Sequence, residues 1–290
     1  MPTRKPSDVE KALGSTAPCV EFRLDYADGV GPELIKALED AVARKTAIFT
    51  IRRREEGGHW ARSEEERISL YLKLLELGPS FVDVEAESPA AQAVAQARGP
   101  VKLIASKHEF SGTPPLDVLL SWARKAAEVG DVVKVVTYAH EPRDGLRILS
   151  LIGAVEKPTV AFAMGPAGAY TRVVAAALGS PIVYVSLSEA TAPGQFSLDA
   201  LYAALLSLGV GPGGEGLPAL RDALDWTDGA LMFLLRQRLE ICRDLGRLKK
   251  SQGLPIYDDE REAKVLRRAG DFKQIFEMIV QMCKAVQLVV

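Results

Sequence analysis

The stretch Val132-Val-Lys-Val-Val136 decides the fold, because it is a short β-branched run with amphipathic helical patterns on both sides, at 116–129 and 141–154. This arrangement predicts a strand between two helices. The alternation repeats along the chain, with further strand candidates at 19–24, 47–52, 81–85, 101–105, 159–163 and 182–186. The other helical patterns are at 33–44, 63–78, 88–98, 167–179 and 197–208. Strands joined by helices are parallel. Seven are predicted, one fewer than a (β/α)8 TIM barrel contains.

The eighth strand has to come from the first residues of the chain. Pro6 to Leu13 is predicted as the first helix, with Ser7 as its N-cap, so that only residues 1–5 remain for a strand. Such a strand is short. Either the barrel has a truncated first strand, or the true start of the protein lies upstream of Met1.

Composition limits the classes of partner and compartment. The 36 basic and 38 acidic side chains give a net charge of -2, which favours a small-molecule ligand and predicts neither a nucleic-acid nor a membrane partner. The three cysteines are odd in number and widely separated, which argues against a disulfide framework or a metal site. With no export signal and no apolar run of roughly 18 residues, a cytoplasmic enzyme is expected.

A glycine and proline cluster at 209–218 divides the chain. It cannot hold a helix or a strand and is predicted to be a linker between a barrel domain, 1–208, and an all-helical domain, 219–290. The second domain is predicted to have three helices, at 219–251, 259–269 and 272–290. Its first helix would run about 50 Å, longer than so small a domain is wide, so it is predicted to pair with a second copy in a homodimer.

Charged residues alternate with apolar residues on two of the predicted barrel strands. Glu21, Arg23 and Asp25 share one face of their strand, and Asp83 and Glu85 share one face of another. Such a strand alone is typical of an antiparallel sheet with its polar face in water. Helical crossovers would instead cover the apolar face, so these charges are expected to line the barrel interior or its mouth, where they need partners or a ligand.

Two residues on other predicted strands suggest imine chemistry. Lys134 lies in the middle of an apolar strand, where burial favours the neutral amine, the form that attacks a ketone. An ion-paired or snorkelling lysine is the structural alternative. His108 ends the strand that begins at Val101, which places it at the C-terminal mouth of the barrel and suggests a general acid or base. A hydrogen-bonded structural histidine is the alternative there.

Together these segments resemble the type I 3-dehydroquinate dehydratase family. The resemblance rests on seven segments in order, namely Glu21-Phe-Arg23, Phe49-Thr-Ile-Arg52 with Glu56-Gly-Gly, Val82-Asp-Val-Glu85, Ser106-Lys-His108-Glu-Phe, Asp131-Val-Val-Lys134-Val, Met164-Gly-Pro-Ala-Gly-Ala-Tyr-Thr-Arg172 and Thr191-Ala-Pro-Gly-Gln195. It implies dehydration of 3-dehydroquinate to 3-dehydroshikimate through a Schiff base.

The resemblance also implies a role for each site residue. Lys134 would form the imine, His108 would move the proton, and Glu56 would orient His108. The substrate carboxylate and neighbouring hydroxyls would be bound by Arg172, Thr191 and Gln195, and the ring hydroxyls by Glu21, Arg23 and Arg52. Thr191 replaces the serine usual in the family, which retains the hydroxyl and adds a methyl group. Another Schiff-base lyase or an aldolase remains an alternative for the barrel.

Two cations interrupt the apolar stripe of the long predicted helix. Arg238 and Lys249 are eleven residues apart, so they point in nearly the same direction three turns apart. Buried cations need acidic partners or an anionic ligand, and Glu262 can serve only one of them. The stripe therefore suggests an anion pocket. A coiled-coil edge with snorkelling basic residues is the structural alternative.

The helical segment as a whole resembles the all-helical chorismate mutase family. The resemblance rests on Leu220-Arg221-Asp-Ala-Leu-Asp-Trp-Thr-Asp228, Leu234-Leu-Arg-Gln-Arg238, Gly246-Arg-Leu-Lys249, Ile256-Tyr-Asp258-Asp-Glu-Arg261-Glu262 and Gln287. It implies rearrangement of chorismate to prephenate without metal or cofactor in either domain.

The mutase resemblance assigns roles in the same way. Arg238 and Arg221 would clamp the two carboxylates, and Lys249 with Gln287 would donate to the ether oxygen. Asp258, Arg261 and Glu262 would complete the site. Arg221 is turned about 100° from the face of Arg238 and is expected to serve the partner's pocket. The alternative is that only the dehydratase is active and the helical domain is a dimerisation or ligand-sensing module.

Overall fold

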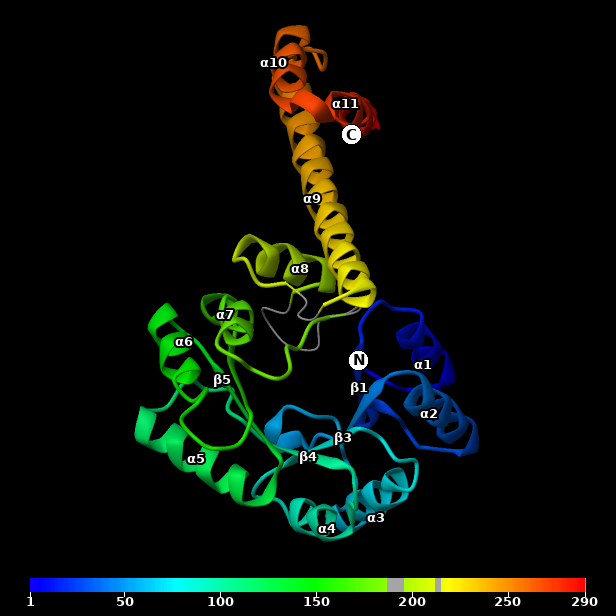
Figure 1. Cartoon of the computed structure of the whole chain (residues 1–290), viewed down its shortest axis with the longest axis vertical. Helices are drawn as coiled ribbons and strands as arrows, with labels where there is room; N and C mark the ends of the chain where they lie inside the picture. The colour runs from blue at the N-terminus through cyan, green and yellow to red at the C-terminus, as the bar shows by residue number, and fades with distance from the viewer. Residues whose placement is uncertain (187–195, 212–214, 290) are drawn as a thin grey trace. The chain divides into compact units, whose positions relative to one another are not determined.

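The computed structural model describes residues 1–186, 196–211 and 215–289. These residues form two compact units, Met1–Leu198 and Asp199–Val290. The first unit contains a parallel sheet in which the strands follow one another in sequence order (Figure 1). The strands are β1 (Cys19–Arg23), β2 (Thr46–Thr50), β3 (Phe81–Glu85), β4 (Lys102–His108), β5 (Val132–Tyr138) and β6 (Thr159–Met164).

Helices connect the strands and cover the outer side of the curved sheet (Figure 1). They are α1 (Pro6–Leu13), α2 (Pro32–Arg44), α3 (Glu64–Leu75), α4 (Pro89–Ala97), α5 (Leu116–Val129), α6 (Pro142–Leu149) and α7 (Thr171–Ala177). Short 3-10 turns occur at Leu24–Tyr26, Arg54–Glu56 and Pro166–Gly168. Sequence order, parallel pairing and outer helices confirm the predicted TIM-barrel class.

The segment at 182–186 differs from the prediction. Among the described residues it forms no ladder, and a single parallel bridge joins Ser186 to Ser197. Its β-branched and aromatic side chains nevertheless contact the core, because Ile182 and Tyr184 are partly buried against the apolar residues inside the sheet. Composition predicts which side chains are buried, whereas a strand also requires a neighbouring backbone to pair with.

Residues 1–3 lie beside β1, where the sequence predicted the eighth strand. Pro2 forms a parallel bridge to Arg23, and the Thr3 amide donates to the Arg23 carbonyl at 3.1 Å. The Arg23 amide in turn donates to the Met1 carbonyl at 2.9 Å. Residues 1–3 therefore pair with β1 at the edge of the sheet.

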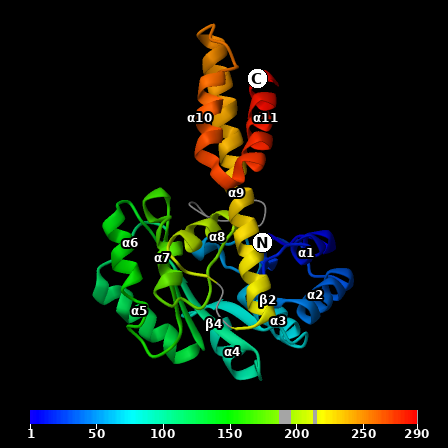
Figure 2. The ribbon, with the colours of Figure 1, turned by 45° about the horizontal axis from the view of Figure 1, so that its top comes forward.

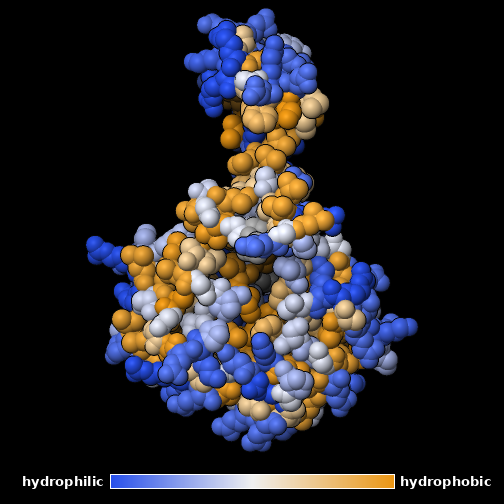
Figure 3. Space-filling view, in the orientation of Figure 1, coloured by the Kyte–Doolittle hydropathy of each residue, from blue (hydrophilic) through white to orange (hydrophobic). Residues whose placement is uncertain are grey.

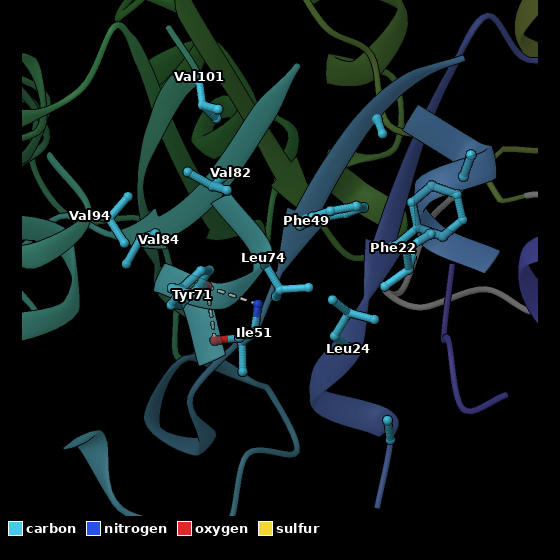
Figure 4. Close-up of a cluster of buried hydrophobic side chains, with 14 of the residues drawn as sticks. Phe22, Leu24, Phe49, Ile51, Tyr71, Leu74, Val82, Val84, Val94 and Val101 are labelled. Atoms are coloured by element: carbon cyan, nitrogen blue, oxygen red, sulfur yellow. Dashed lines mark hydrogen bonds between the residues drawn. The ribbon is translucent and has the colours of Figure 1, made fainter. Parts of the chain in front are cut away.

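The two faces of the strands have the contents that the alternation predicts. Phe22, Leu24 and Phe49 point outward into a cluster with Tyr71 and Leu74 of α3, as Figure 4 shows. The inward face carries the buried charged residues Arg23, Arg52, Asp83, Glu85 and Lys134. Burying the outer face stabilises the barrel at about 25 cal/mol per Å² of apolar surface. It also fixes the register that holds the charges inside.

The second unit is helical. It contains α8 (Leu198–Ser207), α9 (Leu217–Ser251), α10 (Asp259–Ala269), a 3-10 turn at Gly270–Phe272 and α11 (Lys273–Val289). α11 lies alongside α9, and α10 packs against α11 (Figure 2). The α8 helix, which the sequence assigns to the barrel domain, packs here by stacking Tyr202 on Trp226 of α9, with 4.5 Å between ring centroids.

The predicted linker ends slightly earlier than expected. α9 begins at Leu217, inside the range 209–218, with Gly216 as its N-cap and Pro218 in its first turn. Proline is tolerated there because the amides of the first turn have no intrahelical partner. In the part of the chain that the structure describes, no helix is both long and apolar enough to cross a membrane.

Candidate active sites

A cavity of about 80 Å³ lies within the first unit. It is lined by charged residues of the strand ends together with a few apolar side chains. The lining residues are Glu21, Arg23, Arg52, Glu56, Gly57, His108, Phe110, Lys134, Val136, Phe162, Met164, Arg172 and Tyr184. All the predicted barrel residues that the structure describes therefore meet in one place.

Lys134 occupies the centre of this cavity from the middle of β5 and is 4% exposed. Its Nζ donates to Oδ2 of Asp83 at 2.7 Å and lies 3.8 Å from Oε1 of Glu21. The ring of Tyr184 covers it, with the centroid 3.9 Å from Nζ. Asp83 was recognised as inward-facing but not as a site residue. Lys134 is thus buried, as predicted, but it is ion-paired, which was the structural alternative to a neutral amine.

His108 and Glu56 form a pair at the end of β4. The Oε2 atom of Glu56 accepts from the His108 amide at 2.8 Å and lies 3.2 Å from Nδ1 of the ring. A proton on Nδ1 in this contact leaves Nε2 as the free base. Burial, reinforced by Arg52, lowers the pKa of His108 to about 4. Burial alone would raise the pKa of Glu56, but the bond to His108 holds it at about 2.

The predicted ring-hydroxyl residues line the cavity but already have partners. Arg23 forms a bidentate ion pair with Asp25, with both N–O distances at 2.8 Å. Arg52 donates to Asp83 at 2.5 Å, to Ser106 at 2.7 Å and to Glu85 at 2.9 Å. These bonds fix the two guanidinium groups before any ligand arrives.

Glu21 is the third of these residues. It accepts from the Thr50 hydroxyl at 2.8 Å. Burial would raise the pKa of its carboxyl, but the positive charges of Lys134, the N-terminus and Arg23 together outweigh that effect and lower the pKa. Glu21 is therefore held as a carboxylate next to the lysine.

Arg67 supports this network from α3 and was missed by the sequence reasoning. Its side chain is fully buried, contacts Glu85, donates to the Ile51 carbonyl at 3.0 Å and pairs with Glu64 at 2.8 Å. The signal was present, because Arg67 lies four residues before Tyr71 on the buried face of the helix. A cation on an apolar stripe was interpreted for Arg238 but not here.

Three predicted residues concern the carboxylate end of the substrate. Arg172 of α7 is 1% exposed, and its guanidinium carbon lies 4.1 Å from the centroid of the Phe162 ring. Burial lowers the pKa of Arg172 to about 10, so it is cationic at neutral pH. Thr191 and Gln195 lie outside the described residues.

A second cavity, of about 230 Å³, lies within the helical unit. It collects side chains from α9, α10 and α11. Its lining residues are Arg238, Ile241, Cys242, Leu245, Lys249, Ile256, Asp258, Arg261, Glu262, Val265, Val280, Cys283, Lys284 and Gln287. Six of the seven predicted mutase residues therefore converge, and Arg221 is exposed and absent from the lining.

The two cations of the α9 stripe do not meet carboxylates in this cavity. Nη1 of Arg238 contacts the sulfur atoms of Cys283 and, at 4.0 Å, Cys242. Nζ of Lys249 donates to the Ile256 carbonyl at 2.8 Å. Among the described residues neither has an acidic partner, which agrees with the anion pocket predicted from their spacing.

The acidic residues of the cavity are engaged elsewhere. Glu262 pairs with Lys284 at 2.5 Å, and Asp258 caps α10 by accepting from the Arg261 amide at 2.8 Å. Lys284 was missed by the sequence reasoning, although it lies three residues before Gln287 on the same face of α11. Gln287 is buried and donates to the Cys283 carbonyl at 3.1 Å, while its Oε1 has no hydrogen bond among the described residues.

Comparison with known proteins agrees with both cavities. A family model described as type I 3-dehydroquinase matches residues 3–212. The chain belongs to the type I 3-dehydroquinase family. A second model, described as chorismate mutase type II, matches residues 220–288, so the dehydroquinase carries a chorismate mutase domain at its C-terminal side. These matches confirm the predicted enzyme classes, a lyase and an isomerase.

Related proteins extend the likeness to most of the chain. A 3-dehydroquinate dehydratase from Pyrobaculum aerophilum is 70% identical over 289 residues, covering 100% of this chain and 96% of that protein. One from Thermococcus gammatolerans is 39% identical and covers 69% of this chain and 92% of its own length. The crystal structure of the enzyme from Geobacillus kaustophilus HTA426 superposes with a TM-score of 0.66 at 26% identity, covering 70% of this chain and 85% of that one. The likeness to the Pyrobaculum aerophilum protein therefore spans the whole chain, including the helical domain.

Metal ligation is the remaining chemistry to consider. Within residues 1–186, 196–211 and 215–289, no three histidine, cysteine, aspartate or glutamate side chains lie close enough together to hold a metal ion.

Proposed function

We propose that this dehydroquinase is bifunctional, converting 3-dehydroquinate to 3-dehydroshikimate in the barrel and chorismate to prephenate in the helical domain. The observation that carries the second activity is the convergence of Arg238, Lys249, Arg261 and Gln287 on one cavity. Scaffolding requires none of these groups, whereas a dicarboxylate ligand requires cations and donors of this kind.

In the barrel, Lys134 is the proposed nucleophile. The ammonium group of Lys134, paired with Asp83, passes two protons to the ketone oxygen as its nitrogen bonds to the ketone carbon. The oxygen leaves as water, and a protonated iminium remains. The positive iminium nitrogen acidifies the neighbouring C–H bond. Asp83 and Glu21 hold Nζ at the cavity centre, so that the reacting atoms are positioned before the substrate arrives.

His108 is the proposed proton carrier. Nε2 removes the proton next to the iminium carbon, and the electron pair forms a carbon–carbon double bond as the hydroxyl leaves with that proton as water. Hydrolysis of the imine then returns Lys134. Glu56 supports this role by accepting from Nδ1, which keeps the lone pair of Nε2 directed at the substrate.

Binding of the substrate follows the distribution of charge. Arg172 with Thr191 and Gln195 is proposed to hold the carboxylate, because Arg172 is a buried cation that lines the cavity. Glu21, Arg23 and Arg52 are proposed to face the ring hydroxyls. Because Arg23 and Arg52 already hold carboxylates, their fixed positions favour recognition by geometry over recognition by net charge.

In the helical domain the proposed reaction needs no proton transfer. Arg238 binds one carboxylate of chorismate, and Lys249 with Gln287 donates to the ether oxygen as its bond to carbon breaks. For Gln287 the donating Nε2 must turn away from the Cys283 carbonyl that it now contacts. Asp258, Arg261 and Glu262 complete the pocket, with Glu262 proposed to accept from the substrate hydroxyl.

A homodimer formed through the helical domain is part of the proposal. Leu220, Leu224, Leu234 and Ile241 of α9 are each more than half exposed, and hydrophobic residues gather along the middle of this helix in Figure 3. Such a row is typical of a helix that packs against another chain. The partner's α9 would bring Arg221 to the second carboxylate of chorismate. The three free cysteines fit the proposed cytoplasmic location.

The test is to assay the purified chain with 3-dehydroquinate and, separately, with chorismate. Both substrates are expected to be consumed, and product formation is followed by absorbance. Consumption of 3-dehydroquinate without any consumption of chorismate would support the alternative, in which the helical domain only dimerises or senses a ligand.

A further inference from the structure

Tyr184 carries a polar atom that the proposed chemistry does not use. Its hydroxyl oxygen is buried and has no hydrogen bond among the described residues. Leaving a buried hydroxyl unpaired costs about 1–3 kcal/mol, and a phenylalanine would avoid this cost. Packing of the ring therefore does not account for the hydroxyl.

Tyr71 shows what a structural tyrosine looks like in the same unit. Its hydroxyl accepts from the Ile51 amide at 2.8 Å and donates toward the carbonyls of Asp83 at 2.8 Å and Ile51 at 3.2 Å. The two contacts with Ile51 are visible in Figure 4. Tyr71 thus fully satisfies its hydroxyl within the protein, whereas Tyr184 does not.

The position of Tyr184 connects it with the reacting atoms. Its ring lines the barrel cavity and lies over Nζ of Lys134, with 3.9 Å between Nζ and the ring centroid. The ring of Phe162 is its aromatic neighbour, at 6.1 Å between centroids. A phenol oxygen lies one bond beyond the ring edge. It is therefore within reach of substituents on the carbons next to an imine at Nζ.

The hydroxyl retains its proton. Burial, reinforced by the carboxylates of Glu21 and Asp83, raises the pKa of Tyr184 well above its ordinary value. The group is therefore a neutral donor at neutral pH. A neutral donor suits an oxygen of a hydroxylated carboxylic acid.

We propose that Tyr184 is a substrate-binding residue of the dehydratase site, whose hydroxyl donates a hydrogen bond to an oxygen of the ring bound at Lys134. The inference rests on the dehydratase half of the proposed function and adds to it a residue outside the predicted set. In the free enzyme the donor is unpaired, and binding of the substrate satisfies it. The interaction therefore strengthens binding without contributing to the stability of the free protein.

The test is Tyr184→Phe, which removes the hydroxyl and retains the ring over Lys134. KM for 3-dehydroquinate is expected to rise roughly tenfold, as for loss of one hydrogen bond, while kcat changes by less than about twofold. The melting temperature of the free enzyme is expected to stay the same or rise. At saturating 3-dehydroquinate, borohydride should still trap the adduct at Lys134, because the imine does not need the hydroxyl.

Tyr71→Phe is the matched control, with the opposite pattern expected. It leaves the Ile51 amide without its acceptor, so the melting temperature should fall while KM changes little. If Tyr184→Phe leaves KM unchanged, or lowers the melting temperature as Tyr71→Phe does, the inference is overturned and the dehydratase assignment stands. If the wild-type chain does not consume 3-dehydroquinate, both are overturned.

Discussion

In the barrel cavity, Lys134 and Arg52 are surrounded by the carboxylates of Glu21 from β1 and of Asp83 and Glu85 from β3. In the helical cavity, Arg238 contacts two thiols, and Lys249 donates to a backbone carbonyl. One cavity is thus charge-compensated by the chain itself, whereas the other has cations without described acidic partners. The difference follows from the chemistry proposed for each site.

A covalent mechanism needs its nucleophile held in place before the substrate arrives, and fixed carboxylates achieve this at the cost of desolvation. A rearrangement of a dianion instead needs positive charge that is available to the ligand. The comparison therefore predicts that the barrel site is rigid and stable without ligand. It also predicts that the helical site is stabilised by its ligand.

The largest effect should come from Lys134→Ala. Because the covalent step is lost, kcat for 3-dehydroquinate should fall on the order of 10⁴-fold or more, while turnover of chorismate stays unchanged. Steady-state assays with both substrates measure this. Lys102→Ala, at an exposed lysine of β4, is the control and should leave both activities intact. A parallel loss of chorismate turnover would mean that the two sites are not independent.

Stability should depend strongly on the carboxylate network. Arg67→Met removes the cation that meets Glu85 and leaves that carboxylate short of a partner. The free energy of unfolding should fall by about 3–5 kcal/mol. Chemical denaturation measures this, with Arg44→Met as the control, because the Arg44–Asp40 pair is solvent-exposed on both sides and should change stability little. If the two substitutions lower the free energy of unfolding equally, the buried ion pairs of the barrel do not stabilise the protein in the way proposed.

Arg238→Ala should impair the helical site and leave the barrel site active. Loss of one cation from the helical cavity should lower kcat/KM for chorismate by about 10²- to 10³-fold, with 3-dehydroquinate turnover unchanged. Arg236→Ala is the control, two residues along α9 and half exposed, with an ion pair to Asp199. Unchanged chorismate turnover in Arg238→Ala would remove the basis for the mutase site.

Glu56→Gln should produce the smallest loss of activity, and it should shift the pH dependence of that activity in one direction. The pKa of His108 is lowered to about 4, so the base is neutral above that pH, and kcat/KM should fall only as the pH approaches about 4. Glu56 raises the pKa of His108 against the larger effect of burial, so its removal should move this acidic limb to lower pH. With orientation of His108 weakened, kcat should fall roughly tenfold to a hundredfold. Movement of the acidic limb of kcat/KM to higher pH would contradict the assigned contact between Glu56 and His108.

The same two groups make the folded state less stable at acidic pH than at neutral pH. Both pKa values are lower in the folded protein than in the unfolded chain, where ordinary values near 6.5 and 4.5 apply. The folded state is therefore favoured above those ordinary values and loses this contribution as the pH falls toward 4 for His108 and toward 2 for Glu56.

The sequence predicted the features that depend on a single strand or helix. Alternation placed Lys134 on a buried strand, and the eleven-residue spacing placed Arg238 and Lys249 in one cavity, because both are properties of a single element. The pairing of the segment at 182–186 depends on neighbouring backbone and could not be read from its composition. The ion pair between Lys134 and Asp83 joins two strands 51 residues apart, which no local periodicity records.

For the residues that the sequence reasoning missed, the same distinction holds between properties of one element and contacts between elements. Arg67 and Lys284 share a helical face with buried residues, so their positions were readable from the sequence, but their carboxylate partners belong to other elements. The unpaired hydroxyl of Tyr184 is a property of the packed interior and has no sequence signal of its own.

The most direct test of two independent sites in one chain is borohydride trapping with 3-dehydroquinate, followed by an assay of the trapped protein with chorismate. Mass spectrometry should locate one reduced adduct at Lys134, dehydratase activity should be lost, and chorismate turnover should be unchanged. Failure to trap an adduct at Lys134, or loss of chorismate turnover in the trapped protein, would contradict the account.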